Sequence, residues 1–159
     1  MLNFQQLVEI VKKITSDIRE DEKATPKAIV VPASEIKNIC TELYQNPSTY
    51  FDMLSCLTGI DNGTEANTIE VVYNLYSIPF NHHMMLKVIL PRENPVMDSV
   101  VEIWRTANWH ERETAEMFGI VFNGHPDLRR LLLPADWEGH PLRKDYQHQE
   151  LYRDVKVKY

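Results

Sequence analysis

The first third of the chain places apolar residues at helical spacing, interrupted by one short β-branched run. Between residues 3 and 19 the apolar side chains recur every three or four positions, which predicts an amphipathic helix. The charged stretch 19–27 predicts an exposed linker, and residues 28–31, AIVV, predict a short strand. A second helix is expected from Ser34, whose hydroxyl can cap it, to the stop at Asn46-Pro47.

The middle of the chain has the apolar runs and alternation that are typical of strands. Residues 51–60 are mostly apolar, which predicts a strand buried on both faces. Residues 69–76 and 83–90 alternate between apolar and polar positions, and Asn62-Gly63 favours a hairpin before them. We therefore expect an antiparallel meander of three strands.

After the strands the pattern returns to helical spacing and then fades. The Asn94-Pro95 pair predicts the start of a helix over residues 94–104, and Asn108 with Glu111 resembles a capping box for the next helix. Beyond residue 119 the Pro and Gly content rises, so we expect extended or irregular chain to the end.

This succession of elements predicts an α+β fold with two layers. The expected order is α-β-α-β-β-β-α with a mixed sheet, and two consecutive helices form its last helical region. We expect a globular domain over residues 1–124 and an extended tail over residues 125–159 that docks to a partner.

Composition excludes several classes of protein. The chain has 159 residues, of which 43% are apolar and 25% are charged, as in one ordinary globular domain. No apolar run approaches the roughly 20 residues that span a bilayer, and the N-terminus lacks the pattern of a secretory signal. Cys40 and Cys56 lack the spacing of a zinc or iron–sulfur site, so we expect reduced thiols.

The charge of the chain is unevenly distributed. The formal net charge of −6 argues against binding to nucleic acid or to an anionic membrane. Residues 125–159 hold seven Arg and Lys against six Asp and Glu, whereas residues 1–124 hold ten against seventeen. A near-neutral, charge-dense tail on an acidic domain suits docking to a protein surface of mixed charge.

Residues 109–146 mix both signs of charge with His, Trp and Tyr. They contain no G-x-S-x-G elbow and no Gly-rich phosphate loop, so the usual nucleophile and nucleotide sites are missing. Interleaved aromatic and basic residues can bind single-stranded nucleic acid, but the acids among them, such as Asp127 and Asp136, would repel phosphates. Because Arg, Trp and Tyr are enriched at protein–protein hot spots, the segment favours a protein partner.

The same segment resembles the C subunit of the respiratory NADH:quinone oxidoreductases, the complex I family. The motif of that family reads E-R-E, two residues, an acid and two apolar residues, followed at fixed spacing by a His or Lys, a basic residue or Pro, and two apolar residues. The defined positions are filled by Glu111, Arg112, Glu113, Glu116, Met117, Phe118, His125, Arg129, Leu131 and Leu132. Residues 137–146, WEGHPLRKDY, look like the second hallmark of this family, while Ala115 and Gln147 depart from its usual sequence.

The resemblance implies a structural subunit that has no catalytic site of its own. It would brace the quinone-binding subunit in the hydrophilic arm of a proton-pumping enzyme that passes electrons from NADH to quinone. Its partners would be other members of the complex, chiefly the D subunit and also the B and I subunits, with no nucleic acid and only indirect contact with the membrane. We expect no cofactor in this chain, with the flavin, iron–sulfur clusters and quinone in the partner subunits. The implied location is the cytoplasmic face of the bacterial inner membrane.

The candidate partner-binding residues are the charged and aromatic side chains of this segment. They are Glu111, Arg112, Glu113, His125, Arg129, Arg130, Trp137, His140, Arg143, Lys144, Asp145 and Tyr146. Residues after about 134 have few apolar anchors, so we expect them to become ordered on binding the partner. On this interpretation Arg143 and Asp145 serve assembly and are dispensable for folding.

Two other functions fit parts of the sequence. Within the family, the equivalent subunit of a membrane-bound hydrogenase shares the first motif, whereas WEGHPLRKDY favours the respiratory enzyme. From a different class, Glu113, Glu116 and His125 could hold a metal in a stand-alone hydrolase. His110-Glu111 begins an H-E-x-x-H motif, but position 114 is Thr, so the second ligand of that motif is missing.

Overall fold

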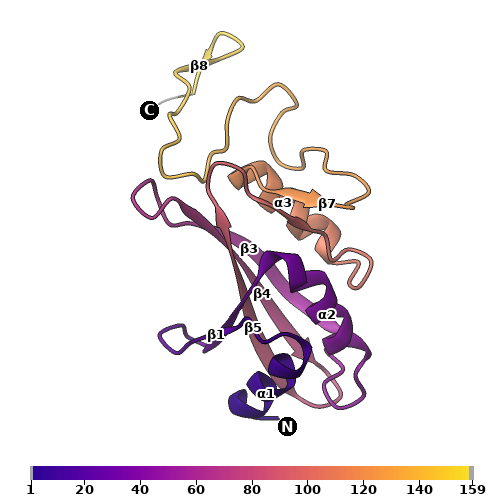
Figure 1. The fold of residues 1–159 in the computed structure, drawn as a ribbon. Coiled ribbons are helices and arrows are strands. Elements are labelled where there is room, and N and C mark those ends of the chain that lie inside the picture. Colours follow the sequence, from indigo (N-terminus) through magenta and orange to yellow (C-terminus); the bar gives the residue numbers. More distant parts are fainter. Residues whose placement is uncertain (1, 158–159) are drawn as a thin grey trace.

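The computed structural model describes residues 2–157 and shows a twisted five-stranded sheet with helices against one face (Figure 1). The strand order is β1-β2-β5-β4-β3. The strands are β1 (Arg19–Asp21), β2 (Ala28–Val31), β3 (Met53–Asp61), β4 (Thr68–Ser77) and β5 (His82–Pro91). β3, β4 and β5 form the expected antiparallel meander, and β2 pairs with β5 in parallel, so the predicted α+β fold with a mixed sheet is confirmed.

Three α-helices carry the apolar stripes that the sequence predicts, with different ends. They are α1 (Phe4–Ile14), α2 (Ile36–Gln45) and α3 (Ala107–Phe118). α1 begins with a reciprocal cap in which the side chains of Asn3 and Gln6 each accept the other's backbone N–H at 2.9 Å. It ends at Ile14, well before the expected end at residue 19.

Three expectations about the N-terminal half are wrong. Ser34 does not cap α2, because it lies inside a short 3₁₀ turn, η1 (Ala33–Glu35), that precedes the helix. The linker expected over residues 19–27 begins as a strand, since β1 pairs antiparallel with β2. β3 is not buried on both faces: it is an edge strand, and its side chains largely alternate between buried and exposed.

The helix expected over residues 94–104 does not form. Instead β6 (Val96–Asp98) pairs in parallel with β7 (Val121–Asn123), which follows α3, and residues 99–106 make turns. The valines of this segment satisfy helical spacing, but their partner strand lies 25 residues further on. A local pattern cannot report such a pairing.

α3 lies against β3 at one end of the sheet, and the rest of the chain crosses that same end (Figure 1). The contact is close at Gly59, where an added Cβ would stand 2.6 Å from the Phe118 ring. Residues 125–150 are extended or in turns, and a two-stranded ribbon, β8 (Leu151–Tyr152) and β9 (Val155–Lys156), follows them. This end of the molecule therefore gathers α3, the β3–β4 hairpin and the tail.

Candidate partner-docking surface

The first Glu of the motif in α3 points into the protein. The Glu111 carboxylate is fully buried and accepts hydrogen bonds from the Ser99 hydroxyl at 2.6 Å and the Val100 N–H at 2.8 Å. Burial raises the pKa of the Glu111 carboxyl to about 7, although both hydrogen bonds favour the ionised form. The predicted capping box of Asn108 and Glu111 is therefore wrong, since α3 begins at Ala107 and Glu111 holds the preceding loop.

The next charged residues of the motif bind the backbone of the tail. Arg112 donates from Nε to the Arg129 carbonyl at 3.0 Å and from a terminal nitrogen to the Arg130 carbonyl at 3.4 Å. The buried Glu116 carboxylate accepts the N–H groups of three consecutive residues at 2.6–3.0 Å, namely Leu131, Leu132 and Leu133. These side chains therefore fix the path of residues 129–133 over the helix.

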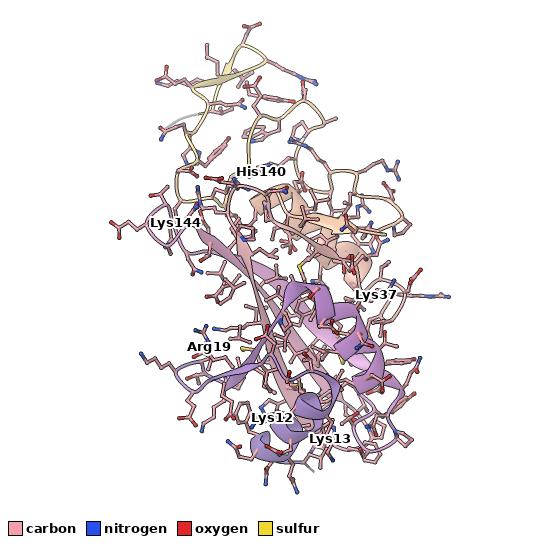
Figure 2. All side chains as sticks on the ribbon, viewed as in Figure 1. Lys12, Lys13, Arg19, Lys37, His140 and Lys144 are labelled. Carbon is pink, nitrogen blue, oxygen red and sulfur yellow. The ribbon has the colours of Figure 1, made fainter. Side chains whose placement is uncertain are left out.

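The C-terminal end of α3 is capped by the tail. Three carbonyls of its last turn accept hydrogen bonds: from His140 Nδ1 to Glu116 at 2.9 Å, from the Leu142 N–H to Met117 at 3.2 Å, and from Arg143 Nε to Phe118 at 2.7 Å. The last carbonyls of a helix have no partner inside the helix, so these donors satisfy groups that would otherwise need water. The stretch 140–143 thus belongs to the end of α3 as much as to the tail (Figure 2).

Gly119 makes this close approach possible. Its φ of +75° lies in the left-handed region that favours glycine after a helix, and its N–H donates to the Ala115 carbonyl at 2.8 Å. A Cβ at this position would stand 2.6 Å from His140 Nε2 and 3.0 Å from a terminal nitrogen of Arg143. Any larger residue would therefore strain the backbone and displace the capping side chains.

A cluster of three charged residues ties the tail to the sheet. The buried Arg92 pairs with Asp61 through two hydrogen bonds of 2.9 and 3.0 Å, and also binds the Asp145 carboxylate. The Lys144 N–H donates to the same Asp61 carboxylate at 2.8 Å. The Arg92 guanidinium holds the pKa of Asp61 well below its ordinary value and also lowers the pKa of Asp145. We call Asp61, Arg92 and Asp145 the Arg92 cluster.

The contacts of Arg143 and Asp145 correct one expectation from the sequence. Both were expected to serve assembly only, yet Arg143 caps α3 and Asp145 completes the Arg92 cluster. Residues after about 134 were expected to become ordered only on binding the partner, whereas the stretch from His140 to Asp145 binds the domain at several points. The error arose because the residues that receive these groups, Arg92 and the end of α3, lie far away in sequence.

His125 is held as a neutral imidazole. Its Nδ1 accepts the Asp127 N–H at 3.0 Å, so Nε2 carries the proton and donates to the Asn108 carbonyl at 3.3 Å. Burial lowers the pKa of His125, and the ring lies 4.0 Å from the Glu111 carboxylate. This histidine fastens the start of the tail to the first turn of α3.

The aromatic residues of the tail contact one another. Trp137 Nε1 donates to the Tyr146 hydroxyl at 3.0 Å, and the Trp137 ring lies 5.3 Å from the Tyr152 ring. The Asp136 carboxylate accepts hydrogen bonds from the Tyr152 hydroxyl at 2.7 Å and from Arg153 at 2.8 Å. The β8–β9 ribbon is therefore folded back on the turn around residue 136.

The structure divides the candidate partner-binding residues into two groups. Most bind within the chain: Glu111, Arg112, His125, Trp137, His140, Arg143, Asp145 and Tyr146. The side chains of Glu113 and Lys144 are exposed, Arg129 pairs at the surface with Asp127, and Arg130 reaches only the Pro134 carbonyl at 3.4 Å. The sequence did not single out Asp61, Arg92 or Ser99, because each stands in a strand end or turn without a motif of its own.

The proposed metal ligands do not come together. Both oxygens of Glu116 are occupied by backbone N–H groups, Glu113 is exposed, and His125 faces Glu111. In the part of the chain that the structure describes, no group of three or more His, Cys, Asp or Glu side chains could hold a metal ion. Arg112 and Glu116 lie four residues apart on α3, and each side chain binds the backbone of the tail.

Over residues 2–157, no helix is both long enough and apolar enough to cross a bilayer. The exposed end of α3 and the tail together form a polar surface with scattered apolar side chains, among them Trp109, Leu132 and Leu142, which are 55–61% exposed.

Comparisons with a family model and with individual proteins all match this chain to the same kind of subunit. Residues 29–152 match the sequence model of the family described as the respiratory-chain NADH dehydrogenase 30 kDa subunit. The chain is 41% identical over 141 residues to the C subunit of NADH-quinone oxidoreductase from Chlorobium phaeobacteroides, covering 88% of this chain and 84% of that protein. It is 38% identical to the C subunit from Moorella thermoacetica, covering 92% of this chain and 97% of that one. The match to the C subunit from Chloroherpeton thalassium, at 51% identity over 69% of this chain, spans only 45% of the longer relative.

Solved structures show the same fold. The trypsin-resistant fragment (1–134) of Nqo5 is similar with a TM-score of 0.63 and 27% identity, over 77% of this chain and 98% of that fragment. A chain of the membrane-bound sulfane sulfur reductase, an archaeal respiratory membrane complex, gives a TM-score of 0.72 at 22% identity, over 90% of this chain and 85% of that one. The second likeness concerns the fold alone.

Proposed function

Because the chain belongs to the family of the respiratory-chain NADH dehydrogenase 30 kDa subunit, we propose that it is a non-catalytic structural subunit of a proton-pumping NADH:quinone oxidoreductase. The observation that carries the proposal is the similarity to proteins named as the C subunit of NADH-quinone oxidoreductase over 88–92% of the chain. In this role the chain braces the quinone-binding subunit in the hydrophilic arm of the complex. Electron transfer from NADH to quinone depends on it without passing through it.

The geometry of the motif supports a scaffolding role. The side chains of Glu111, Arg112 and Glu116 form their hydrogen bonds with the loop before α3 and with the backbone of the tail. Side chains so fully occupied are suited to holding a surface in a fixed shape. The motif therefore acts as an internal frame for a docking surface.

The proposal extends to partners, cofactors and location. The quinone-binding D subunit is the chief partner, with the B and I subunits as neighbours, and the flavin, iron–sulfur clusters and quinone reside outside this chain. The complex places this chain at the cytoplasmic face of the bacterial inner membrane, where it touches the membrane only through its partners. Elemental analysis and the visible spectrum of the purified chain test the cofactor part: about one iron or zinc per chain, or a flavin band, would contradict it.

Deletion and complementation test the role of the chain as a subunit. Membranes from a strain that lacks it should lose NADH:quinone oxidoreductase activity, and the restored chain should co-purify with the detergent-solubilised complex in a one-to-one ratio with the other subunits. NADH oxidation by ferricyanide, which needs only the electron-input end, serves as the control for the rest of the enzyme. Full quinone reduction in the deletion strain would refute the proposal.

A second candidate is the equivalent subunit of a membrane-bound hydrogenase. We retain this candidate because a chain of a different respiratory membrane complex, the archaeal membrane-bound sulfane sulfur reductase, has the same fold. The same co-purification separates the two candidates. Recovery of the chain with a hydrogen-oxidising complex, and not with NADH oxidation, would select the hydrogenase.

A further inference from the structure

Three aspartates of the tail are paired within the chain, whereas three of its cations have no carboxylate partner in the described part of the chain. Asp127 binds Arg129 at 2.8 Å, Asp136 binds Arg153 at 2.8 Å, and Asp145 belongs to the Arg92 cluster. By contrast Arg130, Arg143 and Lys144 have no carboxylate within 4.0 Å among residues 2–157. We call these three residues the cationic strip.

The cationic strip borders an apolar hollow. The hollow has a volume of about 320 Å³ and lies between α3, β7 and the tail, with apolar walls at Ala115, Ile120, Val121 and Leu128. Arg130, His140 and the acidic residue Glu116 also line the hollow, and Arg143 lies beside it at Gly119. Lys144 continues the strip toward the β3–β4 hairpin, where its side chain reaches Gly63 (Figure 2).

The hollow exists because the side chains around it are small or already occupied. Ala115 projects only a methyl group, Gly119 has no side chain, and Glu116 is turned toward the backbone of residues 131–133. A space of this size holds several waters, since one water occupies roughly 30 Å³ in the liquid. Waters against apolar walls have few hydrogen-bond partners, so an apolar group that displaces them gains free energy.

We propose that the hollow and the cationic strip receive an acidic segment of a partner subunit that inserts one large apolar side chain between flanking carboxylates. We infer an acidic occupant from charge complementarity, because the guanidinium and ammonium groups of the strip form no ion pair with a carboxylate of residues 2–157. A buried apolar anchor surrounded by a charged rim is the usual arrangement at the centre of a protein interface. The inference rests on the proposed function, from which it takes the existence of partner subunits.

A zero-length cross-link tests the strip in the assembled complex. A carbodiimide joins a lysine Nζ to a carboxylate only when the two are in contact. We expect Lys144 of the wild-type chain in the isolated complex to be joined to an Asp or Glu of another subunit, as mass spectrometry can locate. If Lys144 is cross-linked only to carboxylates of its own chain, or to none at all, the proposal is overturned.

Charge reversal tests the same contact by its effect on assembly. The double variant Arg130→Glu, Lys144→Glu should fall at least about tenfold in recovery with the complex, because like charges then face each other. The double variant Lys13→Glu, Lys23→Glu makes an equal change in charge at positions far from the strip and should assemble normally; Figure 2 labels Lys13 at the opposite end of the molecule. Equal recovery of both variants would refute the strip as a contact.

Filling the hollow tests the apolar anchor. Ala115→Phe should leave the melting temperature of the free chain unchanged or raised, since it occupies empty apolar space, and should reduce recovery with the complex about tenfold. Ala135→Phe, at an exposed position outside the hollow, is the control and should assemble normally. Normal assembly of Ala115→Phe would show that no partner side chain enters the hollow.

Two further outcomes separate this inference from its alternatives. Anionic vesicles of phosphatidylglycerol and a single-stranded oligonucleotide should not bind the purified wild-type chain; binding that the strip variant abolishes would assign the strip to a polyanion and overturn the proposal. If the wild-type chain itself is missing from the complex, the proposed function fails. If the wild-type chain is present and both strip and hollow variants assemble equally well, only this inference fails.

Discussion

The buried carboxyl of Glu111 makes the stability of the folded chain depend on pH. Its folded pKa of about 7 lies above the ordinary value of 4.5, because burial outweighs the hydrogen bonds from Ser99 and Val100. The folded protein therefore binds more protons than the unfolded chain between these two pH values. The contribution of Glu111 to stability is full below about pH 4.5 and declines as the pH rises to about 7.

The change Glu111→Gln should remove this decline. Relative to the wild type, the variant should gain stability on the order of 3 kcal/mol between pH 4.5 and pH 8, because an amide cannot ionise. Denaturant unfolding measured over this pH range checks the difference. The exposed neighbour Glu113→Gln is the matched control, and a Glu111→Gln curve parallel to the wild type would contradict the assignment.

Asp61 has the opposite linkage. The Arg92 guanidinium depresses its pKa, so its contribution to stability is present above the unfolded value of 3.8 and is lost as the pH falls through the folded value. Asp61→Asn should lower the free energy of unfolding by about 3–5 kcal/mol at neutral pH, because Arg92 then stays buried with a weaker partner. The deficit should shrink in acid, because below about pH 3.8 the carboxyl of the unfolded wild-type chain binds a proton while the folded carboxyl stays ionised, which removes part of its contribution to stability.

Unfolding of Asp61→Asn at pH 7 and pH 3 checks this prediction. Asp17→Asn changes an exposed aspartate that makes no ion pair within residues 2–157 and should leave the free energy of unfolding within about 0.5 kcal/mol of the wild type. A deficit for Asp61→Asn that is equal at both pH values would mean that its charge is irrelevant to stability.

At the scale of elements, α3 and the tail complete each other. The helix supplies Glu116 to three N–H groups of residues 131–133, and the tail supplies donors to the last three carbonyls of the helix. Neither element satisfies its own polar groups. We therefore expect the end of α3 and residues 129–143 to open as one cooperative unit.

Hydrogen exchange can detect this unit. Glu116→Gln replaces an acceptor oxygen by an amide NH₂, so at least one N–H of Leu131–Leu133 loses its partner. Exchange at these three amides should become about ten to a hundred times faster, while α1 is unaffected. Glu113→Gln again provides the control, and unchanged exchange at Leu131–Leu133 would disprove the coupling.

Elements that rest on local patterns could be predicted, and those that rest on distant partners could not. The stripes of α1 and α2 and the alternation of β4 and β5 gave the right structures, because burial of one face determines them. β6 was mistaken for a helix, since its pairing with β7 lies across the whole of α3. In the site, the charged motif marked the correct segment, but the sequence could not tell that Arg92 would receive Asp145 from 53 residues away.

At the scale of the whole molecule, the tail does not behave uniformly. Residues 125–146 bind the domain through His125, the cap of α3 and the Arg92 cluster, whereas residues 147–157 mainly contact other parts of the tail. The boundary expected after residue 124 therefore falls within a set of contacts. Two truncated chains can measure which part of the tail contributes to the stability of the domain.

A chain that ends at residue 147 should keep the melting temperature of the full chain within a few degrees, since it retains every contact of the α3 cap and the Arg92 cluster. A chain that ends at residue 124 should lose several kcal/mol, at about 1 kcal/mol per hydrogen bond lost and more for the buried Arg92. Calorimetry of the two fragments checks this. Equal melting temperatures would show that residues 125–146 add nothing to the domain.

The two hydrogen bonds from Arg112 to backbone carbonyls of the tail have a consequence for proteolysis. Arg129 and Arg130 form a dibasic site at the surface, and a trypsin-like protease would recognise either side chain. To cut there, however, the enzyme must draw the carbonyl into its oxyanion hole, and Arg112 already binds both carbonyls. Cleavage must wait until the segment lifts from α3, so its rate measures how often that happens. The rate of this cleavage therefore reports whether residues 129–133 are seated on α3, and so whether the proposed docking surface is formed.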